Sequence, residues 1–241
     1  MKLPRLLLVA SFALAASGVS LAANTSPAQS WLNTYYQDPQ PSELATAVRA
    51  LSREGYFESA GQPAQAIGFF SSVFAEHPEL IDTWFAQFNT LPSKHQRVLA
   101  SALWYSGDPR GEVLLRGMSN KSSPEVRAGI DRLLAQNARP VLLTPVLSES
   151  SMNLQWGAFL ASGKEVYITN ILSAVGSGLP GLNEAARISL AMKAAAHNRV
   201  MEICRAQLDK QPNEVRSVLR AALNEAETHR CLLYTSDAAD E

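Results

Sequence analysis

Four arginines occupy recurring positions in this sequence, and arginine is well suited to binding planar anions. Arg110 and Arg199 each stand at an expected helix start, and Arg127 and Arg216 each follow a Glu-Val pair. The guanidinium fork binds a carboxylate or a phosphate through two parallel hydrogen bonds. Two roles are therefore open: a groove that binds an anionic group of a partner, and contacts that hold helix ends together. Recurrence within one chain favours the structural role, because a duplicated scaffold needs the same contacts twice.

The sequence contains no recognisable catalytic motif. It has no closely spaced metal ligands, no Gly-x-Ser-x-Gly elbow and no phosphate-binding loop, so we predict no catalytic, cofactor-binding or metal-binding residues. His77 and His197 lie beside helix ends, where we expect capping or surface roles. Cys204 has apolar neighbours at helical spacing, which predicts a buried, inert thiol. An all-α enzyme with carboxylate acid and base residues is the alternative, and its candidates are Glu76, Glu112, Glu165 and Glu202.

The elements that would position these residues follow a tandem repeat. Ile67–Gln87 and Trp156–Gly176 match at an offset of 89 residues, which aligns Gly68 with Gly157. The same register pairs Arg110 with Arg199, Arg116 with Arg205, and Glu125-Val126-Arg127 with Glu214-Val215-Arg216. A run of matches in one register indicates duplication of a helical unit. Both glycines fall inside helical patterns, where glycine costs about 1 kcal/mol relative to alanine. We therefore predict a close helix–helix approach at these glycines.

Helical periodicity, interrupted by proline and glycine residues, divides the chain into three parts. These are N-terminal helices (23–63), a first helical unit with a joint (64–151) and a second unit (152–230). The apolar stripe of Met152, Trp156 and Phe159 belongs to a helix that ends at Ser162-Gly163. The other helices expected in the two units are Ala64–Glu76, Glu79–Phe88, Lys94–Tyr105, Arg110–Met118, Pro124–Gln136, Val166–Val175, Asn183–His197, Arg199–Lys210 and Pro212–Thr228. We expect Trp84, Phe85, Phe88 and Trp104 to be core residues.

The fold class predicted is all-α: helical hairpins in two tandem units of about 89 residues, forming a short α-solenoid. Helices of 10–16 residues joined by short turns resemble the tetratricopeptide and HEAT-like repeats in architecture. The Trp-Leu-Gly-Tyr pattern of tetratricopeptide repeats does not occur, so the resemblance assigns no family. It implies a long curved surface suited to binding a protein or a peptide.

Both ends of the chain carry segments that lie outside this fold. Lys2 and Arg5 precede the apolar run Leu6–Ala16, and Ser20 and Ala22 fit a cleavage site, so residues 1–22 are predicted to be a secretory signal peptide. This predicts a periplasmic or extracellular protein without stable membrane insertion of the mature chain. Residues 231–241, CLLYTSDAADE, resemble a translated sequencing adapter, which implies that the native reading frame is cut near Arg230.

Charge and composition limit the classes of function that we expect. Without the two terminal segments, 19 of the 21 Lys and Arg residues and 19 of the 22 Asp and Glu residues remain, so the mature part is neutral. A neutral chain gives no reason to expect nucleic acid as a partner. We predict an exported helical-repeat binding or scaffold protein whose partner is a protein or peptide. The alternatives are the N-terminal part of a larger exported protein and the carboxylate enzyme considered above.

Overall fold

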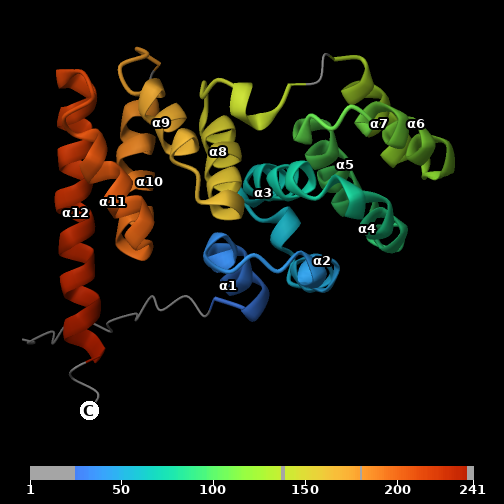
Figure 1. Cartoon of the computed structure of the whole chain (residues 1–241), viewed down its shortest axis with the longest axis horizontal. Coiled ribbons are helices and arrows are strands. Elements are labelled where there is room, and N and C mark those ends of the chain that lie inside the picture. Colours follow the sequence, from blue (N-terminus) through green and yellow to red (C-terminus); the bar gives the residue numbers. More distant parts are fainter. Residues whose placement is uncertain (1–24, 137–138, 180, 238–241) are drawn as a thin grey trace, which may run out of the picture.

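The protein is helical throughout the part that the computed structural model describes, residues 25–136, 139–179 and 181–237 (Figure 1). No strand occurs in these residues, which confirms the all-α prediction. None of their helices is long and apolar enough to cross a membrane. The predicted signal peptide, residues 1–22, lies outside them. The α-helices are α1 (Pro27–Thr34), α2 (Leu44–Arg53), α3 (Gln62–Glu76), α4 (Ile81–Phe88), α5 (Ser93–Ser106), α6 (Gly111–Lys121), α7 (Pro124–Leu134), α8 (Glu149–Ser162), α9 (Glu165–Ala174), α10 (Leu182–Ala196), α11 (Asn198–Gln207) and α12 (Asn213–Asp237).

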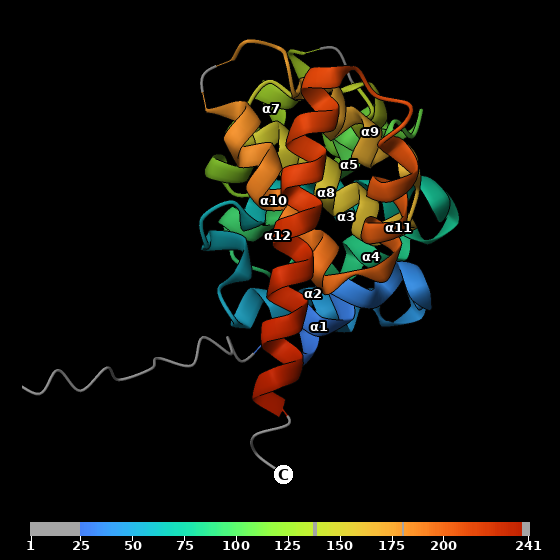
Figure 2. The same ribbon diagram turned by 90° about the vertical axis from the view of Figure 1, so that its left-hand side faces the viewer.

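Ten of the α-helices form two sets of five, and the first helix of each set belongs to a central pair. The first helix set is α3–α7 and the second helix set is α8–α12. Helices at the same place in the two sets are offset by about the repeat length: α5 and α10 begin 89 residues apart, and so do α7 and α12. The central helices are α3 and α8, with α6 near one end of the molecule and α12 at the other (Figure 1). Seen from that second end, α12 lies in front of the second set (Figure 2). The arrangement of two units as a solenoid stays a prediction.

The central pair packs through the two aligned glycines. A Cβ atom added to Gly68 would lie 1.9 Å from the carbonyl oxygen of Leu154, and one added to Gly157 would lie 1.9 Å from that of Gln65. Leu154 aligns with Gln65 at the offset of 89, so the contact is reciprocal, as in a two-fold interface. Only glycine permits two helix backbones to approach this closely. The predicted close approach at Gly68 and Gly157 is thus confirmed.

Local signals set the ends of the central helices. Proline at position 78 follows the end of α3, and the residue before a proline avoids helical backbone. Ser148 and Ser151 form a capping box at the start of α8, and Gly163 ends α8 in the left-handed conformation (φ 64°), as predicted. Glu76, the last residue of α3, pairs with Lys164, which follows α8, at 2.7 Å between Oε1 and Nζ. The C-terminal ends of the two helices therefore lie close together.

A buried side chain fixes the predicted joint between the sets. Gln155 of α8 is fully buried and donates hydrogen bonds to the carbonyl oxygens of Val141 (2.9 Å) and Thr144 (2.8 Å). Asn170 of α9 donates to the side-chain oxygen of Gln155 (3.2 Å) and to the carbonyl oxygen of Leu142 (3.1 Å). Buried amides must be paired, so these bonds hold the joint against α8 and α9.

Aromatic side chains fill much of the core around the central pair. Phe69, Phe70, Phe74, Trp156 and Phe159 are fully buried. Of the four aromatics expected in the core, Trp84, Phe88 and Trp104 are buried, whereas Phe85 is only partly buried. Phe85 is the exception because the side of α4 that carries it faces a groove.

Candidate functional site

Two of the four candidate arginines make the same structural contact in each helix set. Arg127 Nε donates to the carbonyl oxygen of Ser119 (3.1 Å), and Arg216 Nε donates to that of Leu208 (3.0 Å). Ser119 and Leu208 are themselves 89 residues apart. Each arginine thus binds a carbonyl near the end of the preceding helix, where the last four carbonyls lack helical partners. The structural interpretation of this pair is supported by geometry, and the anion-binding one is not.

The other two arginines differ from each other. Arg110 is held by Asp108 (3.0 Å) and donates through Nη2 to the carbonyl oxygen of Pro78 (2.5 Å). Its guanidinium in turn lowers the pKa of Asp108. Arg199 is half-exposed and makes one longer ion pair with Glu202 (3.6 Å). The four arginines do not share a set of partners, and Arg110 alone connects to the groove described next.

We expect Arg216→Gln to lower the free energy of unfolding by about 1–2 kcal/mol, because two carbonyls lose a charged donor. Those carbonyls belong to Leu208 and Gln211. Arg199→Gln is the matched control and should change stability by less than about 0.5 kcal/mol, since exposed ion pairs contribute little. Urea unfolding at pH 7 measures both. Equal effects of the two substitutions would contradict the structural role of Arg216.

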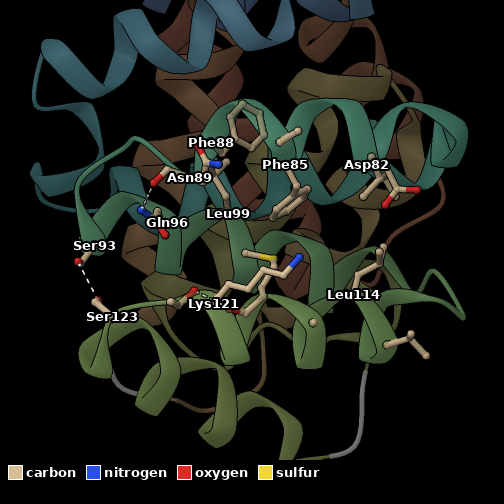
Figure 3. A pocket seen from close by; sticks show the side chains of 16 residues that line it. Asp82, Phe85, Phe88, Asn89, Ser93, Gln96, Leu99, Leu114, Lys121 and Ser123 are labelled. Atoms are coloured by element: carbon tan, nitrogen blue, oxygen red, sulfur yellow. Dashed lines mark hydrogen bonds between the residues drawn. The ribbon is translucent and has the colours of Figure 1, made fainter.

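A groove of about 710 Å³ lies between α4 and α6, and we call it the α4–α6 groove (Figure 3). Helix α5 forms its floor. Val113, on the α6 side, is 70% exposed. Gly117 stands in the middle of α6, and a Cβ atom added there would meet nothing within 4 Å. The apolar side chains that line the groove include Phe85, Phe88, Leu99, Val113, Leu114 and Met118.

Two hydrogen bonds hold the groove at its ends. At one end, Arg110 before α6 binds the carbonyl oxygen of Pro78 before α4 (2.5 Å). At the other end, the hydroxyls of Ser93 and Ser123 lie 3.2 Å apart (Figure 3). Gln96 fixes the turn after α4 by donating to the carbonyl oxygens of Asn89 and Leu91. The first bond joins the starts of α4 and α6, and the second joins the starts of α5 and α7 at the opposite end of the groove.

In the second helix set, side chains bridge α9 and α11, the helices that correspond to α4 and α6 in order. There the side chain of Glu165, at the start of α9, accepts a hydrogen bond from Gln207 and lies 3.9 Å from Lys210 Nζ. At the offset of 89, Gln207 corresponds to Met118 and Lys210 to Lys121. The counterpart of Glu165 is Glu76, which is already paired with Lys164. Met118 and Lys121 therefore face an open groove, whereas their counterparts close one.

The carboxylates of the enzyme alternative are each paired and accessible. Glu76 binds Lys164 (2.7 Å), Glu112 binds Arg116 (2.7 Å), and Glu202 lies near Arg199. Their side chains and that of Glu165 are 35–66% exposed. None of the four lies in a deep apolar cleft, where a carboxyl could become a general acid. Within the described residues, no group of three His, Cys, Asp or Glu side chains could hold a metal ion.

One polar cluster was not predicted. Ser52 Oγ of α2 lies 2.7 Å from Nδ1 of His95 in α5, and His95 Nε2 lies 3.5 Å from Glu58 Oε1. Serine, histidine and a carboxylate in this order are the residue types of a hydrolytic triad. However, His95 is buried under the ring of Phe57, and neither Ser52 nor His95 lines the α4–α6 groove or the two smaller cavities. The cluster ties α2 to α5, and we assign it no chemistry.

Burial confirms the prediction for Cys204 and corrects the one for His197. Cys204 is buried, and desolvation raises the pKa of its thiol to about 12, so it stays protonated and inert, as predicted. His197 is also buried, contrary to the surface position expected for it. It precedes α11 but caps no helix with its side chain, and its ring packs 6.0 Å from that of Tyr36.

The groove could have been anticipated only in part from the sequence. A glycine and an exposed valine in the short helix α6 are signals of an unusual surface, but neither locates the opposite wall on α4. Comparisons with family models, curated proteins and solved structures found no match to this chain. Function must therefore be argued from the site itself.

Proposed function

We propose that this chain is an exported binding protein, built from two copies of a five-helix unit, whose α4–α6 groove holds a helix of a protein partner. The observation that carries the proposal is the open groove itself. Its walls expose apolar side chains, with Val113 70% exposed, while the equivalent gap in the second helix set is bridged. Exposed apolar surface bordered by polar residues marks interaction sites.

The helical floor and walls favour a helical ligand over an extended one. An extended peptide needs backbone partners, which sheet edges supply, but this groove is lined chiefly by residues of α4, α5 and α6. Helical backbone groups are already bonded to each other within each helix. An extended strand in the groove would leave its own amides unpaired next to apolar side chains. A helix satisfies its own amides and presents an apolar stripe, which is the helix-in-groove mode of recognition.

Gly117→Leu tests the proposal, because Gly117 lines the groove and a Cβ atom added there meets nothing within 4 Å. The probe is a fluorescein-labelled amphipathic peptide of about 14 residues with leucines at positions i, i+3, i+4 and i+7, added to the mature chain. We expect Gly117→Leu to weaken binding at least tenfold, as measured by fluorescence anisotropy, because the side chain occupies the volume of the ligand. Gly117→Ala is the matched control and should bind normally. Undiminished binding to Gly117→Leu would contradict the proposal.

A further inference from the structure

The charges that line the α4–α6 groove are few and lie at different points along it. Of its sixteen lining residues only Asp82 and Lys121 are charged. Asp82 is at the start of α4, next to Leu114 of α6, and the side chain of Lys121 extends into the groove from the last residue of α6 (Figure 3). From this polarity, and on the basis of the function proposed above, we infer that the groove selects an amphipathic helix with a basic residue at one end of its apolar stripe and an acidic residue at the other.

The Asp82 end carries an excess of negative charge. Asp108 pairs with Arg110 there, and the pKa of Arg110 is raised mainly by Asp108 and, to a smaller extent, by Asp82 and Glu79. Three carboxylates thus face one guanidinium. Asp82 has no cation within 4.0 Å in the described part of the chain, so its carboxylate is free to pair with a ligand. A lysine or arginine of a partner helix supplies the missing positive charge.

The Lys121 end presents the opposite charge. In the second helix set the equivalent lysine, Lys210, lies 3.9 Å from Glu165. Among the described residues, Lys121 has no carboxylate within 4.0 Å, and Glu76, the counterpart of Glu165, pairs with Lys164 instead. The hydroxyls of Ser93 and Ser123 border the same end of the groove. An acidic side chain of the ligand therefore takes the place that Glu165 occupies beside Lys210.

The length of the groove fixes the spacing of the two ligand charges. Leu114, which faces Asp82, and Lys121 are seven residues apart on α6. At about 1.5 Å per residue this is roughly 10 Å, or two helical turns. The ligand is a helix with oppositely charged residues about seven positions apart. Its apolar residues between them, at the third and fourth positions, contact Phe85, Leu114 and Met118.

Peptides that differ only in their two charges test this inference on the full mature chain. They share one apolar stripe and carry Lys and Glu, Lys and Lys, or Glu and Glu seven positions apart. Reversing one exposed charge contact should change the dissociation constant roughly threefold to tenfold. The protein should bind the Lys/Glu peptide best, Lys121→Glu should prefer Lys/Lys, and Asp82→Lys should prefer Glu/Glu. Arg132→Glu on α7 is the charge-matched control and should keep the original preference.

The outcomes separate this inference from the function on which it rests. If all three peptides bound equally and Gly117→Leu abolished that binding, the charge preference would be overturned. The proposal of a helix-binding groove would stand. Failure of every peptide to bind, or binding that Gly117→Leu does not weaken, would overturn both. The preferences should also shrink in 0.5 M salt, since exposed charge pairs are screened.

Discussion

Gly157→Leu should destabilise the protein by more than about 3 kcal/mol, the largest effect that we expect from a single substitution. A Cβ atom at this position would lie 1.9 Å from the carbonyl oxygen of Gln65 and 2.7 Å from the backbone nitrogen of Phe69. Both neighbours are backbone atoms of α3, so no side chain can move aside and the two central helices must separate. Overpacking a core typically costs about 1–3 kcal/mol, and displacing a helix backbone places this case above that range.

The measurement is urea unfolding followed by circular dichroism, with Gly157→Ala as a smaller step in the same direction. Gly117→Ala is the matched control, because it is also a mid-helix glycine but has open space around it. It should stabilise the protein by about 0.5–1 kcal/mol, the difference in helix propensity. If Gly157→Leu unfolded at the same urea concentration as the parent, the close approach of α3 and α8 would be refuted.

The second large effect is a loss of stability in mild acid that originates at His197. Burial, and secondarily the charge of Lys193 one turn earlier on α10, lowers the pKa of His197 from 6.5 to about 4. Between these values the unfolded chain binds a proton that the folded chain does not bind. The free energy of unfolding therefore rises with pH across this window, and it falls as the pH drops from 6.5 towards 4. We expect a loss of about 2–3 kcal/mol from this group.

His197→Gln should remove most of this pH dependence, whatever its effect on stability at pH 7. His229→Gln is the control, because His229 is half-exposed. Urea unfolding at pH 7, 5.5 and 4.5 gives the comparison. An unchanged pH profile in His197→Gln would show that other groups cause the acid loss.

The sequence predicted the features that depend on local signals and on repetition. The order of the helices, the ends of α3 and α8 at proline and glycine, and the contact at Gly68 and Gly157 all follow from patterns along the chain. The aligned pair Arg127 and Arg216 follows for the same reason, since a repeated residue type makes a repeated contact. In each case the cause is a local signal or a repeat that can be read along the chain.

The features that the sequence did not predict depend on how separate elements meet. His197 looks like a residue at a helix boundary, and its burial depends on Tyr36, which lies far away in the sequence. The α4–α6 groove is a second case: Glu165 pairs with Lys210 after α11, whereas its counterpart Glu76 pairs with Lys164 after α8, so aligned residues make different contacts. Helix periodicity identifies apolar faces but does not tell which of them a neighbouring helix covers.

Photo-cross-linking in the cell that produces the protein tests the central claim, helix binding in the α4–α6 groove, most directly. A benzophenone amino acid replaces Val113 on the groove wall or, as a control, Met192, an exposed apolar residue on α10. We predict that position 113 cross-links to an amphipathic helix of another protein, identified by mass spectrometry. The product should disappear with Gly117→Leu, persist with Gly117→Ala and be absent from position 192. No product from position 113, or a product that persists with Gly117→Leu, would contradict the proposed function.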